Sequence, residues 1–107
     1  MKNLPGQKGP FDPMDYPALQ GFFPAYLHQD FGEEYATAAE AVKGFLSDAS
    51  GDEILQVKEE WNTLRHALRD SSLREIQQAL ERLGSAWQPE SERQLQELDE
   101  ILRHAET

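Results

Sequence analysis

The sequence predicts an all-α protein, a compact bundle of about five helices. After Tyr16, apolar residues recur almost everywhere at the spacings of three and four that are typical of amphipathic helices. No segment shows the alternating pattern of a strand bounded by hairpin turns. At 107 residues the chain is long enough for one core. We therefore expect a single helical domain over residues 16–107, preceded by a flexible lead-in over residues 1–15 that is rich in proline and glycine.

The first helix is expected to begin near Pro17, a residue suited to a first helical turn, and to end near Leu27. Gly32 then allows the chain to reverse. Pro24 removes one backbone hydrogen bond and crowds the preceding turn, so we expect the helix to be kinked or broken there. One face of this helix is strongly apolar and consists of Leu19, Phe22, Phe23, Tyr26 and Leu27.

Capping patterns mark the next two helices. Thr37 and Glu40 have the spacing of a capping box, which predicts the start of a second helix. The Ser50-Gly51 pair is interpreted as its end, and a third helix is expected from about Asp52. The apolar faces of these helices are, in order, Ala38, Ala41, Val42, Phe45, Leu46 and Ala49, then Ile54, Val57, Trp61, Leu64 and Leu68.

A second capping box, formed by Ser72 and Glu75, predicts the start of a fourth helix, and Gly84 predicts its end. Because the connection from the third helix is short, we expect the third and fourth helices to form an antiparallel hairpin. Pro89 at a first-turn position predicts a fifth helix. The apolar face of that helix is Leu95, Leu98, Ile101 and Leu102.

Composition narrows the classes of function. Twenty acidic side chains stand against ten basic ones, a formal net charge of −10. This argues against direct binding to nucleic acid and favours a positively charged partner. The chain has no cysteine, and hence no disulfide or thiolate site, so a cytoplasmic location is the default expectation. Residues 1–13 contain no apolar run long enough for a signal peptide or a membrane span, and we expect no membrane partner.

His28, with Asp30, Glu33 and Glu34, is the clearest candidate for chemistry, because imidazole and carboxylates serve as metal ligands and acid/base groups. Their spacing does not favour it, since no HExxH pair is present. There is also no glycine-rich phosphate loop and no nucleophile elbow. We therefore expect no catalytic residue, metal site, cofactor or small-molecule substrate. His28 is interpreted as the end of the first helix, donating to its last carbonyls or packing against Phe31.

Aromatic and acidic side chains are both unevenly distributed. Eight of the ten aromatic residues lie in the first 45 positions, and most of them are expected in the core. Tyr26 and Tyr35 are the expected exceptions, because their hydroxyls need water or a partner. Between His28 and Glu60, nine acidic residues face only two lysines. This acidic segment is either a solvated surface or a surface that attracts a basic partner.

Several motifs occur together in the following order: Tyr16-Pro17-Ala18-Leu19 with Phe22-Phe23, Ala25-Tyr26-Leu27-His28-Gln29-Asp30-Phe31, Tyr35, Glu40-Ala41-Val42 with Phe45-Leu46, and Leu83-Gly84 with Trp87 and Pro89. They resemble the contact-dependent growth inhibition immunity protein family over most of residues 16–102. The sequence HQD followed by an aromatic residue is the most recognisable element. Pro24, Trp87 and the lack of a tryptophan in the last helix depart from the family pattern and leave the details of the partner surface open.

The resemblance implies a small helical protein of the bacterial cytoplasm, without catalytic activity, that binds and neutralises the C-terminal toxin domain delivered by a neighbouring cell. Toxins of such systems are often nucleases, and some partners of this family resemble ribonuclease A, with a basic substrate groove. We expect inhibition by occlusion of the active site, with carboxylates in the places of phosphates. The expected toxin-binding residues are Asp30, Glu33, Glu34, Tyr35, Asp48, Asp52 and Glu53.

Two alternative functions remain open from the sequence. An acidic helical adaptor or regulator would use the same acidic face on a basic host protein. A small metal-dependent hydrolase would use His28 and Asp30. The identity of the toxin, steric or allosteric inhibition and the oligomeric state are also open.

Overall fold

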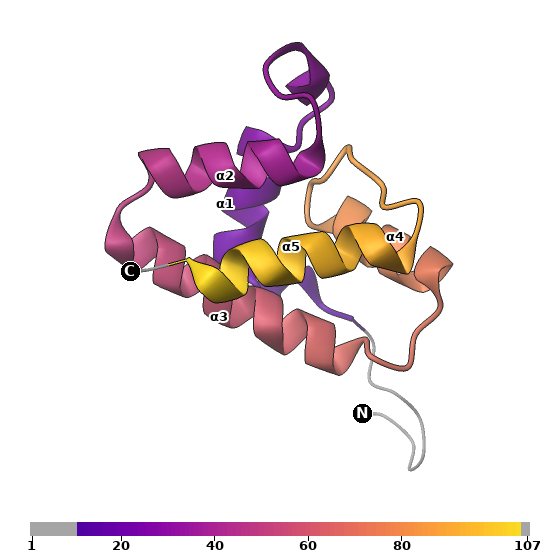
Figure 1. The fold of residues 1–107 in the computed structure, drawn as a ribbon. Coiled ribbons are helices and arrows are strands. Elements are labelled where there is room, and N and C mark those ends of the chain that lie inside the picture. The colour runs from indigo at the N-terminus through magenta and orange to yellow at the C-terminus, as the bar shows by residue number, and fades with distance from the viewer. Residues whose placement is uncertain (1–10, 106–107) are drawn as a thin grey trace.

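The computed structural model describes residues 11–105, which form five α-helices and no strand (Figure 1). The expected all-α bundle of five helices is therefore confirmed. Residues 1–10, most of the expected lead-in, lie outside the described residues. The helices are α1 (Pro17–Tyr26), α2 (Ala38–Asp48), α3 (Gly51–Ala67), α4 (Leu73–Arg82) and α5 (Glu92–His104), with short 3₁₀ turns at Pro13–Asp15 and Phe31–Glu33.

One hydrophobic core joins all five helices. α1 packs against α3 and α2, and α5 packs against α2 and α3. The side chains that are almost wholly inaccessible come from every helix and include Leu19, Phe23, Leu27, Val42, Trp61, Leu64, Leu80, Leu83, Leu95 and Leu98. Most of the predicted apolar faces are thus buried. No helix of the described residues is long and apolar enough to cross a membrane.

Of the two outcomes expected at Pro24, a kink or a break, the break does not occur, because α1 continues through the proline. Pro24 lies in the last turn, where its missing N–H affects only the bond to the Gln20 carbonyl. The N–H of Leu27 still donates to the Phe23 carbonyl at 2.8 Å and closes the turn. The proline ring lies beside Gly84, where an added Cβ atom would be 3.0 Å from Cδ of the proline. Pro24 is therefore a contact point between α1 and a distant turn.

The start of α3 differs from the prediction. Ser50 begins this helix and does not end α2: its hydroxyl accepts from the Glu53 N–H at 3.2 Å, and the Glu53 carboxylate accepts from the Ser50 N–H at 2.9 Å. At the start of α2 only half of the expected capping box forms. The Thr37 hydroxyl accepts from the Glu40 N–H at 3.1 Å, and the hydrogen bonds of the described residues include no return bond from the Glu40 carboxylate.

The start of α5 also differs from the prediction, because the helix begins at Glu92 and not at Pro89. The Ser91 hydroxyl caps it by accepting from the Gln94 N–H at 3.4 Å. Pro89 is buried, and its carbonyl accepts a hydrogen bond of 2.6 Å from Nε2 of Gln77. The proline therefore holds the α4–α5 connection against α4 and does not open α5.

The capping box of Ser72 and Glu75 is confirmed at the start of α4, and Gly84 follows its end with a φ angle of +100°. The expected hairpin is wrong, since α3 and α4 do not pack along their lengths. After α4, the turn at Gly84 brings the Ala86 N–H to the Leu27 carbonyl at 2.9 Å. This bond ties the α4–α5 connection to the end of α1.

α1 obtains its N-terminal cap from another helix. Tyr16, the residue before its first turn, makes no side-chain capping bond. Instead the Glu60 carboxylate of α3 accepts from the Leu19 N–H at 3.0 Å. One turn further along, the ring of Phe23 lies against Trp61 of α3, with the ring centroids 6.3 Å apart. The position of α1 therefore depends on α3.

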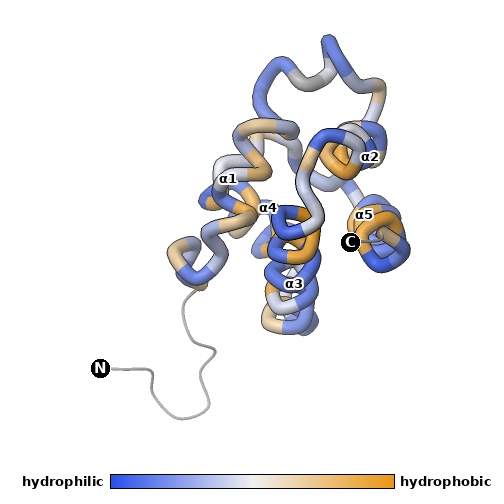
Figure 2. Tube along the Cα trace, turned by 90° about the vertical axis from the view of Figure 1, so that its left-hand side faces the viewer, coloured by the Kyte–Doolittle hydropathy of each residue, from blue (hydrophilic) through white to orange (hydrophobic). Residues whose placement is uncertain are grey.

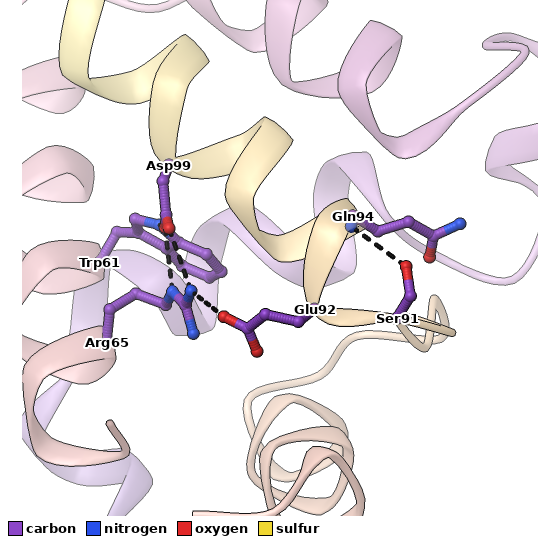
Figure 3. A network of polar contacts seen from close by, with 6 residues as sticks. All are labelled: Trp61, Arg65, Ser91, Glu92, Gln94 and Asp99. Carbon is purple, nitrogen blue, oxygen red and sulfur yellow. Dashed lines mark hydrogen bonds and ion pairs between the residues drawn. The ribbon is translucent and has the colours of Figure 1, made fainter. Parts of the chain in front are cut away.

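A polar network then fixes α3 to α5 (Figure 3). One carboxylate oxygen of Asp99 in α5 accepts from Nε1 of Trp61 at 2.7 Å and from Nε of Arg65 at 2.9 Å. The second oxygen accepts from the Arg65 guanidinium at 3.0 Å, and Glu92 accepts from the same guanidinium at 2.7 Å. Burial lowers the pKa of Arg65, but the bonds to Asp99 and Glu92 outweigh burial and leave the pKa raised. Because both oxygens of Asp99 bind Arg65, this contact sets the register and the spacing of α3 and α5.

We expect Asp99→Ala to lower the free energy of unfolding by about 2 kcal/mol, because it leaves the partly buried Trp61 N–H without its acceptor and Arg65 with Glu92 alone. Urea unfolding measures the change. Glu100→Ala removes an exposed carboxylate of the same helix and should stay within about 0.5 kcal/mol of the wild type. Equal effects of the two substitutions would show that the network contributes nothing specific.

Candidate binding surface

The seven residues predicted to bind a partner fall into two groups at opposite ends of α2, which is 11 residues long and so spans about 16 Å. The acidic loop, residues 28–36, precedes α2 and carries Asp30, Glu33 and Glu34. Asp48, Asp52 and Glu53 lie at the junction of α2 with α3. The predicted residues therefore do not form one cluster.

The acidic loop projects from the helices, at the top of Figure 1, and is largely hydrophilic in Figure 2. The carboxylates of Asp30, Glu33 and Glu34 are exposed. Nδ1 of His28 accepts from the Asp30 N–H at 3.0 Å, and the Asp30 carbonyl accepts from the Glu33 N–H at 3.0 Å. His28 thus organises the loop as an acceptor, whereas donation to the last carbonyls of α1 was one of the two roles expected for it. The described residues contain no cluster of three or more His, Cys, Asp or Glu side chains that could hold a metal ion.

Tyr35 connects the loop to the helices. Its ring is half-buried and rests on α2 at Gly44, where an added Cβ atom would lie only 2.7 Å from the ring. Only glycine leaves room for this approach. Tyr35 is also close enough to Tyr26 to contribute to the raised pKa of that residue. The two tyrosines, which were expected to be the partly accessible aromatic residues, therefore lie between the two acidic groups.

A groove runs between α1 and the α2–α3 junction, with a volume of about 630 Å³. Its floor is apolar and includes Phe22, Phe45 and Val57. The residues of α1 that form one wall are Pro17, Ala18, Gly21, Ala25 and Tyr26. On the opposite wall lie the second group of predicted acids, Asp48, Asp52 and Glu53, together with Ala49 and Gln56. The groove thus combines an apolar floor with an acidic rim.

All charged side chains that line the groove are acidic. No lysine, arginine or histidine lines the groove, and none of the ion pairs within residues 11–105 involves Asp48, Asp52 or Glu53. The Tyr26 hydroxyl donates to Asp48 across a long 3.5 Å contact. Burial, and then the Asp48 charge, raise the pKa of Tyr26. The groove therefore presents unneutralised negative charge beside apolar surface.

Two acids of the acidic segment have structural roles, and one of them, Glu53, is also a residue of the rim. Glu60 caps α1, and one oxygen of Glu53 caps α3. Sequence reasoning did not single out the groove or its small-residue wall. Ala18, Gly21 and Ala25 recur at spacings of three and four on α1, a signal that the sequence does carry. The aromatic residues of the neighbouring face form a stronger pattern, and the prediction followed that pattern and not the small residues.

We expect the Tyr26 phenol to ionise above its ordinary pKa of about 10. Because the folded state holds this proton more tightly, its contribution to stability is present at neutral pH and is lost as the pH rises through the raised pKa. Ultraviolet titration should show Asp48→Asn lowering the pKa of one tyrosine. Burial, Asp15 and Glu60 raise the pKa of Tyr16, which should not respond to this substitution. An unchanged titration curve would contradict the coupling.

Comparison with known families places this geometry in context. The family model described as CdiI immunity protein matches residues 15–106, which covers all five helices, the acidic loop and the groove. The search of the curated proteins and the search of the solved structures returned no significant match. The earlier resemblance is therefore confirmed by the family model. The chain belongs to the CdiI immunity protein family, the family of proteins that confer immunity against the toxins of contact-dependent growth inhibition.

Proposed function

We propose that this protein neutralises a cognate toxin domain, a cationic nuclease, by covering its active site with the acidic surface of α1, α2 and the first turn of α3. The observation that carries the proposal is the unneutralised rim of Asp48, Asp52 and Glu53 around an apolar groove. A net charge of −10 adds a long-range attraction to a basic partner. Carboxylates in such a rim can occupy positions that bind substrate phosphates.

The acidic loop supplies a second contact. Asp30, Glu33 and Glu34 are exposed on a projecting segment, while Tyr35 holds the base of that segment against α2. Exposed charges at the edge of an interface mainly accelerate encounter, whereas apolar side chains that become buried slow dissociation. The loop is therefore assigned to steering the toxin domain, and the groove, which includes Tyr26, to retaining it.

This function requires binding alone. The protein acts as an inhibitor in the cytoplasm, without catalysis, cofactor, direct nucleic-acid contact or membrane contact. Inhibition is steric, since the surface that attracts the toxin domain also covers its basic substrate groove. A ribonuclease A-like toxin domain would fit this scheme, because it carries such a groove.

Co-expression with the toxin domain encoded beside the gene should restore growth of a sensitive cell, and the two proteins should co-purify with a Kd below the micromolar range. Growth rescue, pull-down and calorimetry measure the outcome. Absence of both protection and complex would contradict the proposal.

Two other outcomes would favour the alternative functions. If the protein gives no protection but captures a basic host protein from a lysate without toxin, an adaptor function is favoured. If a metal chelator abolishes protection, the metal-dependent hydrolase that would use His28 and Asp30 is favoured.

The double charge reversal Glu33→Lys with Glu34→Lys should slow association with the toxin domain roughly tenfold at low salt, because it inverts the charge of the steering loop. The difference should shrink at high salt, where screening shortens the range of the field. Stopped-flow mixing at two salt concentrations measures it.

Glu97→Lys with Glu100→Lys is the matched control. These residues are exposed on α5 and change the net charge by the same amount. The control should slow association much less than the loop variant. Equal slowing by the two variants would show that net charge alone, and not the acidic loop, steers the toxin domain.

A further inference from the structure

We propose that the groove between α1 and the α2–α3 junction is the anchor site for a basic segment of the toxin domain, one that inserts an apolar side chain toward Phe22 and Val57 and directs a lysine or arginine at Asp48. This inference rests on the proposed function and names the chemistry of the partner segment. It assigns tight binding to the groove and not to the more conspicuous acidic loop.

The wall on α1 allows a close backbone approach. Ala18, Gly21 and Ala25 follow one another along the helix, and an added Cβ atom at Gly21 would meet nothing within 4 Å. The groove follows α1 from Pro17 to Tyr26, a length of about 15 Å. A wall of small side chains of this length suits two to three turns of a helix or a short extended segment.

The aromatic residues of the groove pack against one another without a partner. The ring centroids of Phe22 and Phe45 are 5.0 Å apart, those of Tyr26 and Phe45 are 5.4 Å apart, and those of Phe22 and Tyr26 are 5.8 Å apart. Interlocked rings of this kind cannot move independently. A preformed apolar site loses little conformational entropy when it is filled, so contacts made there contribute fully to affinity.

Asp48 is the residue that points most directly to a cationic partner. It is the last residue of α2, where the helix dipole is negative and an acidic side chain is unfavourable. Its carboxylate accepts a hydrogen bond from the neutral Tyr26 hydroxyl at 3.5 Å. By contrast, Asp52 and Glu53 stand in the first turn of α3, where acids are favourable without any partner. A lysine or arginine in the groove would relieve the unfavourable charge at Asp48.

The same charges exclude other occupants. A second copy of the chain would bring two acidic rims together, and an anionic ligand or nucleic acid would be repelled. The nearby basic residue of α3, Lys58, is bound to the Ala105 carbonyl at 2.9 Å, and Lys58 is not a lining residue. The groove therefore takes a segment that brings its own positive charge.

The test uses two substitutions that should not destabilise the fold. Gly21→Gln fills the open groove and replaces a helical glycine by a better helix former. Asp48→Asn removes the unfavourable charge from the end of α2 with little change in shape. The controls lie at exposed positions outside the groove: Thr63→Gln introduces the same side chain on a helix, and Asp70→Asn removes the same charge. Thermal unfolding should show no loss of stability in any of the four variants.

The probe is the toxin domain encoded beside the gene, obtained by co-expression with this chain, separated in denaturant and refolded. Calorimetry should show that Gly21→Gln and Asp48→Asn each weaken binding at least tenfold, while each control changes Kd less than twofold. The affinity of Asp48→Asn should also depend less on salt than that of the wild type, whereas the affinity of Gly21→Gln should keep its salt dependence. This difference separates the charge contact from the apolar contact.

The outcomes distinguish the two proposals. If the wild type binds and protects but Gly21→Gln and Asp48→Asn bind equally well, the groove is not the anchor and the immunity function stands. If the wild type neither binds nor protects, the proposed function fails and the groove assignment fails with it. A wild-type dimer in solution that Gly21→Gln dissociates would overturn the groove assignment in favour of self-association.

Discussion

The placement of α1 on α3 is the constraint on which the rest of the structure depends. α1 has no capping side chain of its own and contains a proline, so it is a poor helix in isolation. Glu60 caps its first turn, and Trp61 packs against its middle. Trp61 is held in turn by Asp99 of α5. A helix that the local sequence supports weakly is thereby fixed by neighbours some forty to eighty positions away.

The candidate functional surfaces are built on this one helix. The groove follows the accessible side of α1, and the acidic loop leaves from its end. The opposite side of α1 carries the buried leucines and phenylalanines of the core. A shift of α1 would therefore change the groove and the root of the loop together. The bonds that hold α1 would therefore influence the proposed binding from a distance, because they set the geometry of the groove.

Acidic side chains in this protein divide into two kinds that composition alone does not separate. Asp99 and Glu60 accept hydrogen bonds from donors on other elements and stabilise the fold. Asp48 and Asp52 contact no cation within the described residues and stand beside apolar surface. The first kind has its partners within the fold. The second kind is the one that we propose for contact with a partner, because Asp48 occupies an unfavourable helix end.

The sequence by itself determined the helices, most of the buried faces and the family, because periodicity and capping act over a few residues. It misplaced the starts at Ser50 and Pro89, where one residue can end or begin a helix and only tertiary contacts select between them. Only the tertiary structure shows that α4 turns away from α3 and that the acids at the α2–α3 junction line a groove against α1. Those outcomes depend on contacts such as Ala86 with Leu27, whose partners are far apart in sequence and carry no local pattern.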